Sequence, residues 1–162
     1  MLIRDFTPAD QAELRHVFMS SVHELARNFY TRDQLDAWAP HAHDEQQWAD
    51  RISALCPFVA VVDDQLAGYA DLQASGHIDH FFVAARFSGR GIGSALMEHI
   101  HQAATRRGIP ELSACVSLAA ESFFSRHGFS VARRQSAIVN GISLDNALMT
   151  KRLLSGSSFG PA

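Results

Sequence analysis

The spacing of hydrophobic residues in the first third of the chain predicts a short opening strand followed by three helices. Thr7 followed by Pro8 is typical of a helix start, because threonine caps free backbone N–H groups and proline fits the first helical position. Thr31, with Gln34 three residues later, has the pattern of a capping box at the start of a second helix. The predicted elements are a strand at residues 1–6 and helices at 7–27, 31–39 and 44–55.

From residue 58 onward the pattern changes to short apolar runs separated by turn residues, which predicts strands that alternate with helices. Gly108 and Gly128 follow two helical segments at the positions where glycine commonly ends a helix. The order, an antiparallel meander and then a strand–helix–strand–helix crossover, predicts a mixed α/β domain. The expected strands are 58–62, 65–74, 77–83, 112–116, 129–139 and 142–152, and the expected helices are 91–107 and 119–127.

Composition restricts the class of protein. The chain has 162 residues, of which 47% are hydrophobic and 19% charged, as in a single globular domain. We expect that domain at residues 1–153 and a disordered tail at 154–162, with no run near the roughly 20 apolar residues that cross a bilayer. The N-terminus lacks the apolar segment of a secretory signal. Cys56 and Cys115 are too few for a disulfide framework, so we expect a cytoplasmic protein with reduced thiols and no membrane partner.

Charge is distributed unevenly along the chain. Residues 1–85 hold five arginines and thirteen acids, a net charge of −8, whereas residues 86–162 hold nine basic and four acidic residues, a net charge of +5. The overall charge of −3 argues against a nucleic-acid partner, which requires a basic face. The second half favours an anionic ligand, unless both halves are ordinary solvated surface.

Residues 83–96, VAARFSGRGIGSAL, carry the clearest chemical signal. Gly89, Gly91 and Gly93 lie between a predicted strand and a predicted helix, where backbone N–H groups and the helix N-terminus can hold an anion such as pyrophosphate. The G-x-G-x-x-G dinucleotide pattern fails because Ser94 occupies the place of its third glycine, and the Walker pattern fails because no lysine follows. A purely structural role, as a tight turn with close helix packing, stays open.

The segment Ser88-Gly89-Arg90-Gly91-Ile92-Gly93 resembles motif A, [QR]-x-x-G-x-[GA], of the GNAT superfamily of N-acetyltransferases. Residues 119–129, AAESFFSRHGF, resemble the family's second signature, A-x-x-F-Y-x-[KR]-x-G-F. Residues 30–39, YTRDQLDAWA, are similar to a feature of the YafP-like branch. The resemblance covers residues 2–153. It implies a GNAT fold: a central, mostly antiparallel sheet of six or seven strands, splayed in the middle, with helices on both faces.

The resemblance implies acetyl-CoA as the co-substrate. The backbone amides of residues 89–94 would hold its pyrophosphate, and the strand at 81–83 would pair with its pantetheine arm. A backbone N–H near Val83 would polarise the thioester carbonyl, as in an oxyanion hole. The candidate acetyl-CoA residues are Phe81, Phe82, Val83, Ser88, Gly89, Arg90, Gly91, Ile92, Gly93, Ser94, Ser117, Ala120, Phe123 and Arg126.

Two departures from the family pattern concern the co-substrate. Ser88 replaces the family's glutamine or arginine, and Arg86 and Arg90 are the nearby candidates for the missing contact. Ser117 stands where many members have an asparagine, and it retains a hydroxyl for a pantetheine hydrogen bond.

A third departure concerns the general acid. Phe124 replaces the tyrosine that in many members returns a proton to the CoA thiolate, and phenylalanine has no proton to donate. Ser117, Tyr30 or a water molecule could supply it, or no specific acid is needed. A thiol with a pKa of about 8.5, like that of cysteine, leaves readily near neutral pH.

The general base is expected in the segment just before the pantetheine strand, where the family commonly places a carboxylate or a water-relay residue. An amine with a lysine-like pKa of about 10.4 must lose a proton before it attacks. Asp79 is the favoured base, His80 the second candidate and His77 the third. Alternation along a strand would put His80 on the face opposite the other two, although a bulge there would change this.

The acceptor pocket is expected at the first two helices and the loop between them. Glu24, Tyr30 and Trp38 are the candidate wall residues, and an acidic half with aromatic rings suits a cationic amine. Core packing of Trp38 is the competing interpretation. The histidine pairs 41/43 and 99/101 have a spacing that faces different sides of a helix, so we expect no metal.

These observations predict an N-acetyltransferase that moves the acetyl group of acetyl-CoA directly, in a ternary complex, to a primary amine of a small cationic molecule. Neither cysteine matches a catalytic position, so an acetyl-cysteine intermediate has no support. The alternative is a non-catalytic acyl-CoA-binding sensor or regulatory module. Homodimers formed through edge strands are common in the family, and this sequence neither requires nor excludes one.

Overall fold

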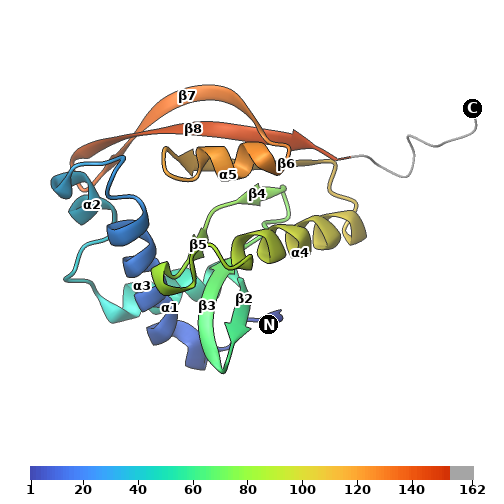
Figure 1. Cartoon of the computed structure of the whole chain (residues 1–162), viewed down its shortest axis with the longest axis horizontal. Coiled ribbons are helices and arrows are strands. Elements are labelled where there is room, and N and C mark those ends of the chain that lie inside the picture. Colours follow the sequence, from blue (N-terminus) through green and yellow to red (C-terminus); the bar gives the residue numbers. More distant parts are fainter. Residues whose placement is uncertain (154–162) are drawn as a thin grey trace, which may run out of the picture.

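The computed structural model describes residues 1–153, in which eight strands form two four-stranded sheets (Figure 1). The first sheet has the order β1-β2-β3-β5 and the second the order β4-β6-β8-β7. The predicted tail at 154–162 lies outside the described residues. The strands are β1 (Leu2–Asp5), β2 (Phe58–Val62), β3 (Gln65–Ala70), β4 (His77–Ile78), β5 (Phe81–Val83), β6 (Glu111–Ser117), β7 (Ser130–Val139) and β8 (Ile142–Arg152).

The helices agree closely with the sequence pattern. Thr31 accepts a hydrogen bond from the Gln34 N–H and closes the predicted capping box, and Asp44 caps the next helix. The first predicted helix is less regular, because its last turn is a π-helix. The α-helices are α1 (Gln11–Ser20), α2 (Arg32–Trp38), α3 (Glu45–Leu55), α4 (Ile92–Arg106) and α5 (Glu121–Arg126). The π-helix is η2 (Ser21–Leu25), and the 3-10 turns are η1 (Pro8–Asp10) and η3 (Ala85–Phe87).

Two-residue turns join the two hairpins. Asp63 and Asp64, between β2 and β3, both have positive φ, and so do Asn140 and Gly141 between β7 and β8. Such turns match the right-handed twist of paired strands, and Asn-Gly is the strongest short sequence signal for them. The antiparallel pairing of β2 with β3, part of the predicted meander, is confirmed. Strands β7 and β8 also pair as a hairpin and form the long arm at the top of Figure 1.

The predicted strand at 77–83 is wrong as a single element. It divides into β4, which pairs in parallel with β6, and β5, which pairs antiparallel with β3. The two parts therefore belong to different sheets, and the chain crosses between the sheets at Asp79 and His80. The predicted strand at 65–74 likewise ends at Ala70, because Asp71 turns its side chain to this crossing. This division raises the number of strands from the expected six or seven to eight in the described residues.

Helices cover both faces of the first sheet. A Cβ atom added at Gly68 would lie 3.2 Å from side-chain atoms of Ile92 and Leu96, so α4 packs on that face of β3. Tyr69 points to the opposite face, as alternation along a strand requires. Its buried ring lies beside His80, which in turn packs on Phe18 of α1. The predicted mixed α/β architecture is confirmed, and no helix within residues 1–153 has the length and apolarity to cross a membrane.

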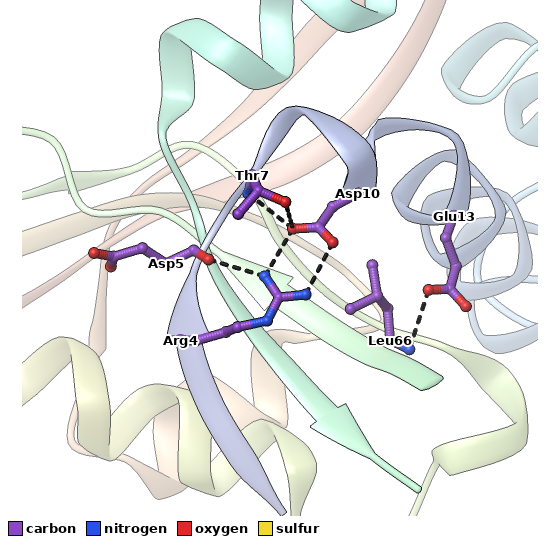
Figure 2. Close-up of polar contacts among 6 residues, drawn as sticks. All are labelled: Arg4, Asp5, Thr7, Asp10, Glu13 and Leu66. Carbon is purple, nitrogen blue, oxygen red and sulfur yellow. Dashed lines mark hydrogen bonds and ion pairs between the residues drawn. The ribbon is translucent and has the colours of Figure 1, made fainter. Parts of the chain in front are cut away.

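A polar cluster fixes the start of the first helix on β1 (Figure 2). The Arg4 guanidinium donates two hydrogen bonds to the Asp10 carboxylate, at 2.8 and 2.9 Å, and the Thr7 N–H donates a third at 2.8 Å. The Arg4 hydrogen bond lowers the pKa of the Asp10 carboxyl. On the next turn, Glu13 accepts a hydrogen bond from the Leu66 N–H at 3.3 Å. Asp10 and Glu13, two acids of the first half, therefore stabilise the fold through these hydrogen bonds.

Candidate active site

A cavity of about 520 Å³ lies at the place where the two sheets diverge. Strand β5, the end of β6, the start of α4, helix α5 and the π-helix η2 contribute its walls. Of the fourteen candidate acetyl-CoA residues, only Arg90 does not line this cavity. Those that do are Phe81, Phe82, Val83, Ser88, Gly89, Gly91, Ile92, Gly93, Ser94, Ser117, Ala120, Phe123 and Arg126.

Two strand edges face this cavity without a ladder between them. Strand β5 is the last strand of the first sheet and pairs only with β3. On the other side, β4 pairs with β6 only at Ser113 and Ala114, which leaves the end of β6 near Ser117 without a partner on that edge. Unpaired backbone groups at a sheet edge can accept an amide-containing arm as an added strand.

The glycine-rich loop forms the other end of the cavity. Gly89 and Gly91 have φ of +74° and +80°, a region that side chains rarely adopt, and a Cβ at either would meet no atom within 4 Å. Gly91 is the N-cap of the 15-residue helix α4, whose first N–H groups have no partner within the helix. Open space, free N–H groups and a helix N-terminus together favour an anion. Gly93 has a packing role as well, because a Cβ there would lie 3.0 Å from Phe123.

Cationic side chains border the loop. Arg126, in the last turn of α5, is the only charged residue among those that line the cavity within residues 1–153. Arg86 and Arg90 each lie with the guanidinium carbon 5.1 Å from the centre of the Phe87 ring. The two arginines considered as substitutes for Ser88 therefore both stack on Phe87 beside the loop.

Aromatic rings close the cavity behind the strand. Phe81 packs on Phe123 and Phe124, with ring centres 5.4 and 5.6 Å apart. Phe124, at the position of the family's tyrosine, is only 3% exposed. Ser117 accepts a hydrogen bond from the Ala120 N–H at 3.3 Å, so its hydroxyl still has a proton to donate.

The candidate bases lie at the crossing between the sheets and do not line the cavity. Asp79 is exposed, and its N–H donates to the Asp71 carboxylate at 2.9 Å. His80 is 4% exposed, its Nδ1 lies 3.0 Å from the Tyr69 hydroxyl, and burial lowers the pKa of its ring to about 4. His77 Nδ1 lies 2.9 Å from the Ser113 hydroxyl. Asp79 is thus the one of the three with an exposed side chain.

The three candidate acceptor residues do not lie together. Trp38 lines the cavity and packs on Phe82 and Tyr30. Tyr30 is buried, and its hydroxyl donates to the Asp145 carbonyl at 2.6 Å and accepts from the Leu118 N–H at 2.9 Å. Those bonds hold β6 and β8 to the helical layer, so the hydroxyl is not the accessible group that the sequence suggested. Glu24 lines a separate hollow of about 610 Å³.

Sequence reasoning missed one wall of the site and one buried polar group next to it. Val22, Leu25 and Ala26 form a cavity wall because of the π-turn, which a regular helical period does not indicate. Asn146 is paired in register with Ser117, and its Oδ1 is buried without a hydrogen-bond partner within residues 1–153. Only the strand register, which the sequence does not give, brings it beside the cavity.

Two histidines and one aspartate lie close together on η2, α2 and the segment that follows α2. Ligand atoms of His23, Asp36 and His41 lie within 4.8 Å of one another. The two rings are stacked, with centres 4.6 Å apart and planes at 27°, and His23 Nε2 lies 2.7 Å from the Ala39 carbonyl. Stacked rings cannot both direct a nitrogen lone pair at one ion, so this arrangement does not form a metal site as it stands.

Comparison with known proteins agrees with this geometry. The family model described as the acetyltransferase (GNAT) domain matches residues 26–152. The uncharacterized N-acetyltransferase YafP of Escherichia coli K12 is 29% identical over 147 residues, which cover 91% of this chain and 93% of YafP.

Two solved structures extend the comparison. A GCN5-related N-acetyltransferase from Rhodopseudomonas palustris is 32% identical with a TM-score of 0.90, over 94% of this chain and 95% of that one. A phosphinothricin acetyltransferase of the GNAT superfamily from Sinorhizobium meliloti, solved in complex with acetyl-CoA, is 22% identical with a TM-score of 0.70. That match covers 99% of this chain and 92% of the other, and it shows a shared fold.

Proposed function

This chain belongs to the acetyltransferase (GNAT) family and is an acetyl-CoA-dependent N-acetyltransferase, and we propose that it acetylates a primary amine of a small cationic molecule by direct transfer. The observation that carries the proposal is the single cavity that joins the glycine-rich loop to the unpaired edges of β5 and β6. The anionic pyrophosphate of acetyl-CoA fits the glycine-rich loop, and its amide-containing arm fits the unpaired strand edges. The neighbour from Sinorhizobium meliloti, which has the same fold, holds acetyl-CoA.

Different residues of the cavity bind different parts of acetyl-CoA. The N–H groups at the start of α4 and the guanidinium of Arg126 favour the pyrophosphate. The backbone of Phe81–Val83 pairs with the pantetheine amides, and a backbone N–H near Val83 polarises the thioester carbonyl. The wall made by η2 and Trp38 lines the same cavity. We expect the amine to approach the acetyl group from that side.

The transfer step requires one base and no dedicated acid. A bond forms between the amine nitrogen and the acetyl carbon, the carbon–sulfur bond breaks, and the surplus amine proton passes through water to Asp79, which lies outside the cavity lining. Asp79 is favoured over His80 because its carboxylate is exposed, whereas the His80 ring is enclosed by Tyr69 and Phe18. The departing thiolate takes its proton from solvent, since buried Phe124 has none to give.

The test is the release of CoA thiol from acetyl-CoA by the full chain, with a set of primary amines and mass spectrometry of the products. Asp79→Asn is expected to lower kcat by about 10²-fold to 10⁴-fold with little change in the KM for acetyl-CoA. Asp63→Asn, in the β2–β3 turn, is the matched control and is expected to keep wild-type kcat. Binding of acetyl-CoA without thiol release with any amine would instead favour the sensor or regulatory module.

A further inference from the structure

We propose that the amine acceptor is a monoamine with an apolar body, and that the wall formed by Val22, Leu25, Ala26 and Trp38 selects it against polyamines. This inference rests on the proposed function and adds the chemical class of the acceptor. It narrows the cationic molecule to one whose only charge is on the reacting nitrogen.

The wall that faces the strands is apolar except for Ser21. Val22 is 1% exposed and Ala26 is 2% exposed, so both present a closely packed surface. Leu25 is 38% exposed, so it supplies accessible apolar surface to this wall, and Trp38 packs on Phe82 of the opposite wall. Ser21 is the only polar residue that η2 and α2 contribute to the lining within residues 1–153.

No carboxylate lies on the cavity wall within residues 1–153, although the first half of the chain is acidic. Glu24 projects from the same π-helix into the separate hollow, together with Glu13 and Arg86. Asp10 is paired with Arg4, and Glu13 bonds the Leu66 N–H (Figure 2). The one charge on the lining, Arg126, is positive.

An apolar wall without a carboxylate favours monoamines over polyamines. The reacting nitrogen arrives as an ammonium and loses its proton before the attack, so its own charge disappears during the reaction. A second ammonium elsewhere on the molecule would remain charged against leucine, valine and tryptophan side chains. A charge that leaves water without a partner is strongly disfavoured, whereas a methyl group at the same place is favoured.

Hexylamine and 1,5-diaminopentane are the matched pair that tests this. Each has seven heavy atoms and an unbranched chain. Hexylamine has one primary amine and a methyl group at the other end, whereas 1,5-diaminopentane has two equivalent primary amines, so one remains as an ammonium while the other reacts. With wild-type protein at saturating acetyl-CoA, kcat/KM is expected to be about 100-fold higher for hexylamine. Equal values, or a preference for the diamine, would overturn the inference.

A charge placed on the wall provides a second test. Leu25→Glu puts a carboxylate on the apolar wall at a half-exposed position, and Leu25→Gln is the control of the same shape without the charge. The ratio of kcat/KM for the diamine to that for hexylamine is expected to rise about fivefold in Leu25→Glu relative to Leu25→Gln. An unchanged ratio would show that Leu25 does not face the acceptor and would overturn the assignment of this wall.

The failure of this inference can be told from the failure of the proposed function. If acetyl-CoA raises the melting temperature but neither amine is acetylated, and other classes of amine are, the acceptor class is wrong and the transferase function stands. If no amine of any class releases CoA thiol, the proposed function itself fails.

Discussion

Asp71 and His80 are joined by a reciprocal pair of hydrogen bonds at the point where the two sheets separate. The Asp71 carboxylate accepts from the His80 N–H at 2.6 Å, and the Asp71 N–H donates to the His80 carbonyl at 3.2 Å. The same carboxylate oxygen also accepts from the Asp79 N–H, and the second oxygen faces the Gln73 amide. A fully buried side chain therefore supplies the acceptor that a neighbouring strand would supply in an unbroken sheet.

Removal of this acceptor is expected to destabilise the protein strongly. Asp71→Ala leaves two N–H groups without an acceptor at an enclosed site, at a cost of about 1–3 kcal/mol each. Asp71→Asn keeps one oxygen for both N–H groups and, because burial raises the pKa of the Asp71 carboxyl, removes a charge that the site disfavours. Its free energy of unfolding in urea should stay within about 1 kcal/mol of wild type. Equal losses for the two variants would contradict this role.

Stability is expected to fall as the pH is lowered from 7 to 5, partly through His80. Burial lowers the pKa of the folded His80 ring to about 4, against an ordinary value of 6.5, so in this range the unfolded chain binds a proton that the folded chain does not. Linkage then predicts a loss of about 2 kcal/mol from His80 between pH 7 and 5. The pKa values of His99, His101 and His127 are also lowered by burial, which acts in the same direction.

Urea unfolding at pH 7, 6 and 5 measures this dependence. His80→Gln keeps a hydrogen-bond acceptor for Tyr69 but does not titrate, so its stability should depend less steeply on pH. His43→Gln, at an exposed position between α2 and α3, is the control and should follow the wild-type slope. A His80→Gln profile parallel to that of wild type would exclude His80 as a source of the pH dependence.

The glycine-rich loop is expected to bind acetyl-CoA through its free N–H groups. At 100 times the dissociation constant, a ligand stabilises the folded state by about 2.7 kcal/mol, which for a chain of this size raises the melting temperature by roughly 5–10 °C. Gly91→Asp should abolish that rise, because a carboxylate would face the phosphate. Gly91→Asn has the same shape and tolerates positive φ, so it should keep most of the rise. Loss of the rise in both variants would indicate backbone strain instead of charge.

Gly93 and Phe123 should be coupled in energy. A Cβ on residue 93 would lie 3.0 Å from the Phe123 ring, although alanine is otherwise favoured over glycine in a helix. Gly93→Ala is therefore expected to cost about 1–3 kcal/mol through overpacking, and the smaller side chain of Phe123→Leu should relieve that cost in the double variant. A double-mutant cycle by urea unfolding should give a coupling energy of about 0.5–3 kcal/mol. Additive effects would show that the ring moves aside freely.

Local sequence signals were sufficient where the structure depends on neighbouring residues. The Thr31–Gln34 capping box and the helix ends at Gly108 and Gly128, both with positive φ, involve nearby backbone groups, so the residue types predict them directly. The glycine-rich loop belongs to the same class, because its backbone conformation requires glycine at fixed positions. All but one of the candidate acetyl-CoA residues consequently line a single cavity.

Features that depend on distant residues could not be predicted in this way. The run from 77 to 83 reads as one strand, and only the contact with Asp71 shows where it breaks. Tyr30 was expected to be accessible, but its partners Leu118 and Asp145 are about a hundred residues away in the sequence. The sequence shows that Glu24 is charged. It does not show that the last turn is the π-helix η2, from which Glu24 faces a hollow separate from the cavity.

The break between β4 and β5 has a consequence for the lifetime of the protein. Within residues 1–153 no ladder joins the two sheets, so an arm bound along both open edges would act as a ninth strand that makes them continuous. Acetyl-CoA and the CoA that remains after the transfer carry the same arm, so either of them would supply this strand. When the supply of acetyl-CoA and CoA together falls, more molecules would remain with the sheets unjoined, and these are the molecules that open most readily to proteases. The abundance of the enzyme would then follow the combined level of acetyl-CoA and CoA.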